Sequence, residues 1–200
     1  MAFTIEETGF TALDIETTGL SPQFCGIVEI AALRFCPDGT SQPFQMLVDP
    51  GCSIPRSASL IHGISDSMVR GQPHADEAVC RLLDFVGESP LVLHNAPFDL
   101  GFLNPVVKAQ KRQWRSQAVF DTLRLSRRIF PGLRSYSLEK LSRFFDFESG
   151  GHHRALADCR YCGLLFSKIL TKIGCARVMD FQDFVQAYAE SEHLLARSAQ

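Results

Sequence analysis

The stretch that decides the fold is Asp14-Ile15-Glu16-Thr17-Thr18-Gly19-Leu20, which follows an apolar run at residues 10–13. That run is typical of a β-strand, and strand side chains alternate between two faces, so Asp14 and Glu16 project from the same face. Two acids at the mouth of a core are costly unless a cation or hydrogen-bond donors compensate their charge. Taken alone, the stretch predicts a divalent metal site and an ordinary acidic turn equally well.

The composition bounds the class of protein. The chain has 200 residues, 46% hydrophobic and 21% charged, which suits one domain, or one domain with an appended helix, around a substantial core. Its apolar runs are shorter than the roughly 20 residues that a membrane-spanning helix needs. Residues 1–7 are acidic, unlike the basic start of a signal peptide, so we expect a cytoplasmic protein with no membrane partner.

The cysteines do not indicate a disulfide framework. There are seven, an odd number, and they are spread over segments that we expect to be buried. Cys159 and Cys162 form a C-x-x-C pair, but within a helical pattern and without a second pair at zinc spacing. We therefore favour packing roles for them over zinc binding or redox chemistry.

Basic residues concentrate in one part of the chain. Residues 104–143 carry ten of the 20 Lys and Arg residues, opposed only by Asp121 and Glu139. A solvated helix surface and a flank that binds a polyanion explain this equally well, although the net charge is −2. The ten are Lys108, Lys111, Arg112, Arg115, Arg124, Arg127, Arg128, Arg134, Lys140 and Arg143.

The pattern of apolar residues predicts a mixed α/β sheet with helices on its faces. We expect three consecutive strands, at residues 10–16, 26–35 and 43–48, in an antiparallel meander. An interior strand follows at 90–94, and a fifth, short strand at 118–120. Helical spacing predicts helices over about 74–86, 99–113, 122–129, 137–145, 154–173 and 178–196.

Two later acids are candidates for the same site as the first pair. Asp99 follows an interior strand at the start of a helix, where the helix dipole favours a carboxylate; ordinary helix charge is the alternative. Asp158 lies in the first turns of a long helix, five residues after His153. Their side chains converge only if His153 lies in the preceding loop, which the glycine pair before it makes plausible.

The chain resembles the DnaQ-like branch (DEDDh) of the DEDD exonuclease superfamily in three motifs: Asp14-x-Glu16-Thr17-Thr18-Gly19, His94-Asn95-Ala96-Pro97-Phe98-Asp99 and His153-x-x-x-x-Asp158. Residues 61–64 and 120–122 are similar to ancillary signatures, so the resemblance covers about Gly9 to Ile173. It implies an RNase H-like fold, a five-stranded mixed sheet of three antiparallel and then two parallel strands, flanked by helices. We expect an exonuclease domain over residues 1–175 and a helical extension over 176–200 that packs on the domain or faces a partner.

The resemblance also implies a two-metal-ion 3′-5′ exonuclease, with two Mg²⁺ or Mn²⁺ ions held by Asp14, Glu16, Asp99 and Asp158. Asp14 would bridge the ions, Glu16 and Asp158 would complete the site of the attacking water, and Asp99 would hold the second ion. His153 is the implied general base, because imidazole titrates near the working pH.

Four residues are implied to meet the substrate. The backbone around Thr17 and Thr18 would contact the terminal 3′ hydroxyl, Leu20 would pack on the last base, and His62 would lie near the substrate. Leu20 is equally compatible with a place in the core. The expected substrate is a frayed, single-stranded 3′ end, held by stacking and phosphate contacts.

The expected function is release of nucleoside 5′-monophosphates from DNA in proofreading or repair, resembling the epsilon subunits of bacterial DNA polymerase III. A DNA polymerase subunit is then a candidate partner. One alternative is an exoribonuclease resembling ribonuclease T or oligoribonuclease, because the motifs do not separate the sugars. Another is a non-catalytic module that docks on a polymerase, against which the intact acids and His153 argue.

Overall fold

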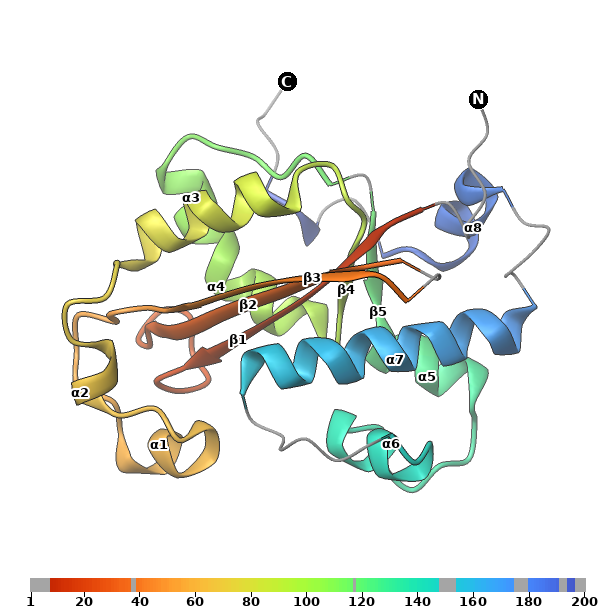
Figure 1. The fold of residues 1–200 in the computed structure, drawn as a ribbon, viewed down its shortest axis with the longest axis horizontal. Helices are drawn as coiled ribbons and strands as arrows, with labels where there is room; N and C mark the ends of the chain where they lie inside the picture. Colours follow the sequence, from red (N-terminus) through yellow and green to blue (C-terminus); the bar gives the residue numbers. More distant parts are fainter. Residues whose placement is uncertain are drawn as a thin grey trace.

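A five-stranded mixed sheet, in the order β3-β2-β1-β4-β5, forms the centre of the computed structural model (Figure 1). β1, β2 and β3 are antiparallel neighbours, whereas β4 and β5 run parallel to β1, which confirms the predicted topology. The structure describes residues 8–36, 39–116, 118–147, 154–174, 180–190 and 194–196. The strands are β1 (Phe10–Thr17), β2 (Ile27–Phe35), β3 (Ser41–Leu47), β4 (Leu91–Leu93) and β5 (Val119–Asp121).

Helices cover both faces of the sheet (Figure 1). On one face, α3 (Ala75–Val86) and α4 (Ala96–Ala109) share an apolar cluster with the sheet. On the other, α5 (Thr122–Ile129), α6 (Leu138–Phe144), α7 (Ala155–Ile173) and α8 (Phe181–Tyr188) share a second cluster. Two short helices, α1 (Arg56–His62) and α2 (Asp66–Val69), form a third cluster with β2.

The alternation of side chains along β1 decides where its acids point. Leu13 and Ile15 belong to the cluster with α3 and α4, whereas Ala12 belongs to the cluster with α7. Because Asp14 and Glu16 have the parity of Ala12, both project toward the α7 face. The sheet therefore delivers two carboxylates to the side on which α7 begins.

The predicted bounds fit the long helix α7 better than they fit α4. α7 matches the predicted helix, and Gly174 ends it in the left-handed conformation at φ 73°. α4 begins at Ala96, earlier than predicted, so Asp99 lies in its first turn.

The predicted helix over residues 178–196 is wrong in length. Among the described residues of this range, the α-helix is α8 and it ends at Tyr188; Ala189 is extended, and the Glu190 N–H donates to the Val119 carbonyl of β5 at 2.7 Å. Backbone pairing beside the sheet therefore replaces the last helical turns. Within the described ranges, no helix is long and apolar enough to cross a bilayer.

Cys159 and Cys162 lie on the buried face of α7. The Cys159 thiol donates to the Ala31 carbonyl at 3.4 Å, and the Cys162 sulfur lies 3.6 Å from the Thr122 hydroxyl. Burial raises the pKa of both thiols, which keeps them protonated. These contacts favour the packing role.

Candidate active site

Three acids from two distant segments converge at one end of the sheet. Asp14 and Glu16 lie near the C-terminal end of β1, and Asp158 lies in the first turn of α7. One carboxylate oxygen from each lies within 4.8 Å of the other two, and all three side chains keep partial exposure. This spacing allows one divalent cation to take all three as ligands.

The fourth predicted acid, Asp99, lies against β1 from the neighbouring helix. Its carboxylate is almost fully buried, and its Oδ1 accepts a hydrogen bond from the Ile15 N–H at 3.2 Å. Ile15 separates Asp14 from Glu16 in the chain, so Asp99 reaches the same part of the strand. Charge repulsion between Asp14 and Asp99 also raises the pKa of Asp14, as expected for close carboxylates.

The cluster is electrostatically unfavourable without a counter-charge. Burial, followed by repulsion from Asp99, Asp158 and Glu16, raises the pKa of Asp14 well above its usual value. Burial and repulsion from Asp158 raise the pKa of Glu16 to about 8. Carboxylates that are hard to ionise together favour a bound cation, and an all-oxygen donor set fits a hard ion such as Mg²⁺ or Mn²⁺.

Asp121 holds the start of the helix that carries Asp99. Its carboxylate accepts hydrogen bonds from the N–H groups of Asn95 at 3.1 Å, Ala96 at 3.2 Å and Leu123 at 2.9 Å. It therefore caps α5, as its position after a strand predicts, and also holds the start of α4. The second role is not visible in the sequence, because it depends on β4 and β5 lying side by side.

Thr17 and Thr18 lie at the start of a tightly bonded loop between β1 and β2. The Thr17 hydroxyl donates to the Gly19 carbonyl at 2.7 Å, and the Thr18 hydroxyl accepts from the Gly26 N–H at 3.0 Å. Leu20 projects from this loop with 84% of its surface exposed, so the interpretation of Leu20 as a core residue is wrong.

His62 lies at the end of α1, buried beside the loop. Its Nδ1 accepts from the Ile64 N–H at 3.0 Å, so the proton is on Nε2. Among the described residues, Nε2 has no acceptor at hydrogen-bonding geometry, although the nearby Thr17 backbone offsets part of the pKa lowering that burial causes. The ring is therefore next to the residue that the motif assigns to the 3′ end.

The predicted general base, His153, lies outside the described residues, as does His152 beside it. The structure describes the chain again from Arg154, the N-cap residue of α7. The assignment of the base to His153 stays a prediction.

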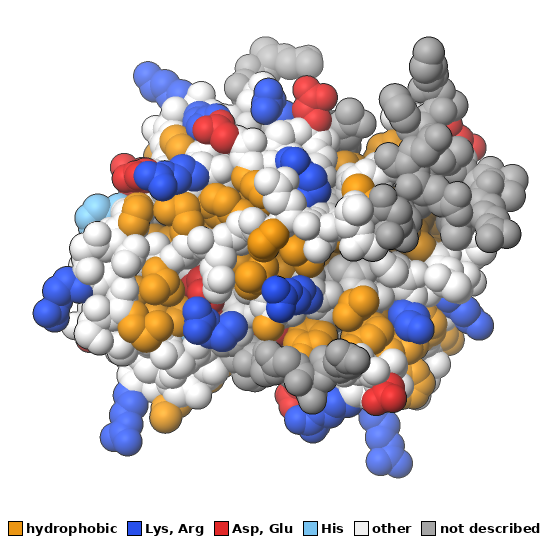
Figure 2. Space-filling model, in the orientation of Figure 1, with side chains coloured by type: hydrophobic (Ala, Val, Ile, Leu, Met, Phe, Trp, Pro, Cys, Tyr) orange, Lys and Arg blue, Asp and Glu red, His pale blue; other side chains and the backbone are white. Residues whose placement is uncertain are grey.

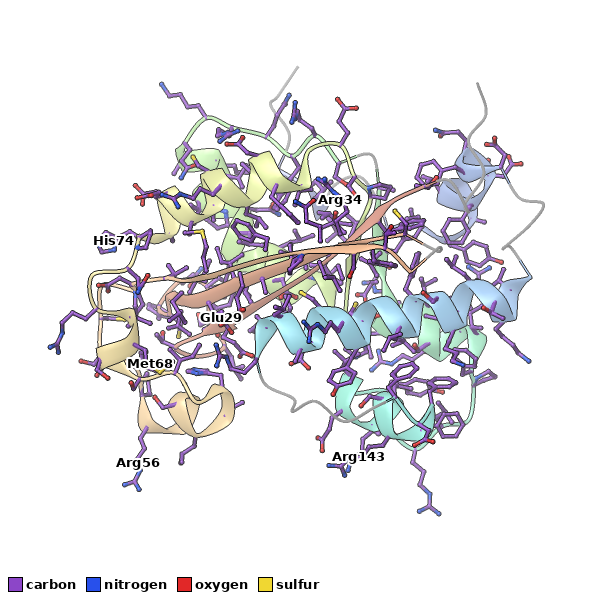
Figure 3. The ribbon with its side chains drawn as sticks, viewed as in Figure 1. Glu29, Arg34, Arg56, Met68, His74 and Arg143 are labelled. Carbon is purple, nitrogen blue, oxygen red and sulfur yellow. The ribbon has the colours of Figure 1, made fainter. Side chains whose placement is uncertain are left out.

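One residue at the site was missed from the sequence. Glu29 of β2 is fully buried, and it is the direct cross-strand partner of Glu16. Its carboxylate receives hydrogen bonds from Arg154 and from the Ala155 N–H at the start of α7, and it lies beside this first turn in Figure 3. A glutamate inside an otherwise apolar strand is the signal that could have identified it.

The ten basic residues of the segment 104–143 do not form one flank. Those near α4 and those on α5 and α6 lie on opposite faces of the sheet, and Figure 2 shows Lys and Arg side chains scattered over the visible surface. Three of them form ion pairs, Arg112 with Asp84 at 2.5 Å, Arg124 with Glu190 at 2.6 Å and Arg143 with Glu139 at 2.6 Å.

Comparison with known proteins defines the class of protein first. The family model described as Exonuclease (RNase_T) matches residues 11–166, which include Asp14, Glu16, Asp99 and Asp158. The chain belongs to this DnaQ-like exonuclease family, as its three motifs predicted, and it is a hydrolytic nuclease.

Two of the similar proteins are epsilon subunits of DNA polymerase III. The DNA polymerase III epsilon subunit of Aquifex aeolicus (strain VF5) is 34% identical over 164 residues, which cover 82% of this chain and 81% of that subunit. The epsilon subunit of Treponema pallidum (strain Nichols) is 37% identical over 167 residues, with 82% and 78% covered.

Solved structures give the same fold. Exonuclease X in complex with 5′-overhanging duplex DNA superposes with a TM-score of 0.69 at 29% identity, covering 82% of this chain and 93% of that one. E. coli exonuclease I in complex with a dT13 oligonucleotide superposes with a TM-score of 0.72 at 19% identity, covering 84% and 42%. The RNase H-like fold is thereby confirmed.

Proposed function

We propose that this chain is a metal-dependent 3′-5′ exonuclease that removes nucleoside 5′-monophosphates from DNA ends, in proofreading or repair. The observation that carries the proposal is the convergence of Asp14, Glu16 and Asp158 within 4.8 Å of one another, in a chain of the exonuclease family. The position of Asp99 against the same strand supports a four-carboxylate site.

The four carboxylates would hold two Mg²⁺ or Mn²⁺ ions. When bound, such a pair activates water, neutralises charge on the reacting phosphate and stabilises the leaving 3′ oxygen. The chain's own part is to hold the four acids in place on β1, α4 and α7. His153 would accept the proton of the attacking water, since a neutral imidazole is a base near neutral pH.

DNA is the favoured substrate because of the relatives. The similar polymerase III proteins are DNA polymerase subunits, and the similar exonuclease X was solved with a 5′-overhanging DNA duplex, whose 3′ ends are recessed. A polymerase subunit is the corresponding candidate partner. PolC-type DNA polymerases also match, although the chain spans only 11% of the length of the one from Halalkalibacterium halodurans.

Exposed apolar side chains near the acids favour a single-stranded end. Leu20 and Phe24 project from the β1–β2 loop with 84% and 85% of their surface exposed, and Leu60 and Ile61 project from α1. The loop is held by its own backbone bonds, including Thr18 N–H to Gly26 O at 2.9 Å, so these side chains are presented without further ordering. Unstacked bases are suitable partners, because a base of any kind can stack on the Phe24 ring and pack against the aliphatic side chains.

The predicted division of the chain at residue 175 is also proposed. Phe181 and Phe184 of α8 pack in the cluster with α7, which supports an extension docked on the exonuclease domain. A helix with these two rings buried presents less apolar surface to a partner.

Nuclease assays test the proposed function. Single-stranded DNA, DNA with a recessed 3′ end and single-stranded RNA, each labelled at the 5′ end, are incubated with Mg²⁺ or Mn²⁺. We expect a ladder shortened from the 3′ end and free nucleoside 5′-monophosphates, faster on DNA than on RNA, and no product in EDTA.

Asp14→Asn should lose at least about 100-fold in kcat, since it removes a ligand but little volume. Asp84→Asn, an equivalent change at an exposed position on α3, should match the wild type. No product from any substrate would refute the enzyme proposal, and faster cleavage of RNA would favour the exoribonuclease.

A further inference from the structure

We propose that Glu29 is a positioning residue that holds the Arg154 guanidinium at the start of α7 and thereby keeps it from pairing with Glu16. Glu16 then stays available to a divalent cation. This inference rests on the metal site of the proposed function and adds a residue that the exonuclease motifs do not include.

Both oxygens of the Glu29 carboxylate are engaged. Oε1 accepts from Arg154 Nη2 at 2.8 Å and from Gln45 Nε2 at 2.9 Å. Oε2 accepts from Arg154 Nε at 3.3 Å and from the Ala155 N–H at 3.1 Å. A fully buried carboxylate with a two-point contact to a guanidinium is a strong and directional partner.

Arg154 has a second acid within reach. The β1–β2 register pairs Glu16 with Glu29, so these side chains stand next to each other on the same face of the sheet. Arg154 also precedes Asp158 by four residues, which is about one helical turn, and Asp158 lies within 4.8 Å of Glu16. The guanidinium is thus placed at the border of the acid cluster.

Burial does not hold Arg154 in this position. Its side chain is 45% exposed, whereas the Glu29 side chain is fully buried, so the hydrogen bonds to Glu29 fix the direction of the guanidinium. The positive charge of Arg154 already lowers the pKa of Glu16, against the larger effects of burial and neighbouring acids. Besides Glu29, Glu16 is a carboxylate whose charge acts on the Arg154 guanidinium, so Glu16 is the alternative partner for Arg154 when Glu29 is removed.

A cation and an arginine would compete for Glu16. An Arg–carboxylate pair occupies the same oxygens that a hard cation needs, and the metal would have to displace it. Removal of Glu29 should therefore weaken metal binding, and removal of Arg154 as well should restore part of it. A purely structural role of Glu29 predicts that removal of Arg154 changes the metal affinity by the same factor with and without Glu29.

The experiment measures Mn²⁺ binding by titration calorimetry in the absence of nucleic acid. We expect Glu29→Gln to raise the Mn²⁺ dissociation constant by about 10- to 100-fold, the range found for residues that support metal ligands. The double variant Glu29→Gln/Arg154→Gln should recover about 5-fold or more of this loss, a larger gain than Arg154→Gln alone gives over the wild type. Glu77→Gln, which breaks an exposed Glu–Arg pair on α3, should bind Mn²⁺ as the wild type does.

Two results would overturn the proposal. One is wild-type Mn²⁺ affinity in Glu29→Gln, and the other is an Arg154→Gln substitution that gains no more Mn²⁺ affinity without Glu29 than it does with Glu29. If Glu29→Gln does not fold, as judged by its circular dichroism, Glu29→Asp and Glu29→Asp/Arg154→Gln make the same comparison, because Asp keeps the buried charge but shortens its reach.

The result is separable from that of the nuclease assays. A wild-type chain that binds Mn²⁺ with this dependence on Glu29 and Arg154, but cleaves no nucleic acid, would contradict only the proposed function. A chain that cleaves DNA, but whose Mn²⁺ affinity is indifferent to Glu29, would contradict only the role of Glu29.

Discussion

Glu16 and Glu29 are cross-strand neighbours with different surroundings. The Glu29 carboxylate is fully buried and receives hydrogen bonds from Arg154, Ala155 and Gln45. Glu16 is only partly buried and faces Asp158, with which it shares a potential cation. Hydrogen-bond donors satisfy the Glu29 carboxylate, whereas the Glu16 carboxylate needs a bound cation to offset its burial and the charge of its acidic neighbours. The same residue type therefore serves as a support in one strand and as a candidate ligand in the next.

The metal-free protein should become less stable as the pH rises from about 5 to 8. Burial and repulsion from Asp158 raise the pKa of Glu16 from 4.5 to about 8. Between these values the folded chain holds a proton that the unfolded chain has released, so raising the pH favours unfolding. We expect the free energy of unfolding to fall by about 1–3 kcal/mol over this range.

Urea denaturation in EDTA at both ends of this pH range measures the effect. Glu16→Gln should reduce the slope, and Glu77→Gln on exposed α3 should keep it. A Glu16→Gln variant with the wild-type slope would contradict the assignment of the pH dependence to Glu16.

At the scale of elements, the four acids lie together at one end of the sheet, where β1 and β4 have their C-terminal ends. β1 ends in Asp14 and Glu16, and parallel β4 ends beside it and leads into α4, whose first turn carries Asp99. The C-terminal ends of parallel strands lie at the same end of a sheet, so residues far apart in sequence meet there. α7 begins beside this end of the sheet and adds Asp158 from its first turn (Figure 1).

Much of this arrangement could be predicted, and the rest depends on contacts between distant segments. The side-chain alternation of β1 predicted that Asp14 and Glu16 share a face, and the motifs pointed to Asp99 and Asp158, which lie at the same end of the sheet. Glu29 was missed because β2 is buried on both faces, which leaves no alternation, and its partner Arg154 is 125 residues away. α8 was predicted too long because apolar periodicity continues past Tyr188, where the backbone instead pairs with β5.

Asp121 should matter for stability and for activity, because it joins two helices. Its carboxylate accepts from the N-terminal N–H groups of both α4 and α5, and α4 carries Asp99. Asp121→Ala should lower the free energy of unfolding by about 2–4 kcal/mol, since buried donors lose their acceptor. It should also lower kcat, because the first turn of α4 loses its support.

Asp180→Ala is the matched control for this prediction. Asp180 caps α8, through the Gln182 N–H at 2.8 Å. It should cost about 1 kcal/mol in urea denaturation and leave kcat unchanged. Equal effects of the two substitutions on kcat would show that Asp121 does not act through α4.

At the scale of the whole molecule, the C-terminal segment contacts both faces of the sheet. α8 packs in the cluster with α7, whereas Leu195 and Ala196 belong to the cluster with α3 and α4. The Trp114 N–H donates to the Ala196 carbonyl at 3.2 Å. The described part of this segment therefore packs on both faces of the sheet near the edge strand β5, away from the C-terminal end of β1 (Figure 1).

Phe184→Ala should destabilise the protein without impairing its chemistry. Phe184 is fully buried, with its ring centroid 4.9 Å from Phe120 and 6.2 Å from Phe166. Loss of such a side chain typically costs about 3–5 kcal/mol, measured here by urea denaturation. Exonuclease activity at low temperature should persist, because α8 packs near Phe10 at the start of β1, whereas the acids lie at its end.

Phe144→Ala is the control for this prediction. At a 61% exposed position on α6, it should change the free energy of unfolding by no more than about 0.5 kcal/mol. If the two variants were equally stable, α8 would not be docked on the domain in solution, and a helix available to a partner would be the better description.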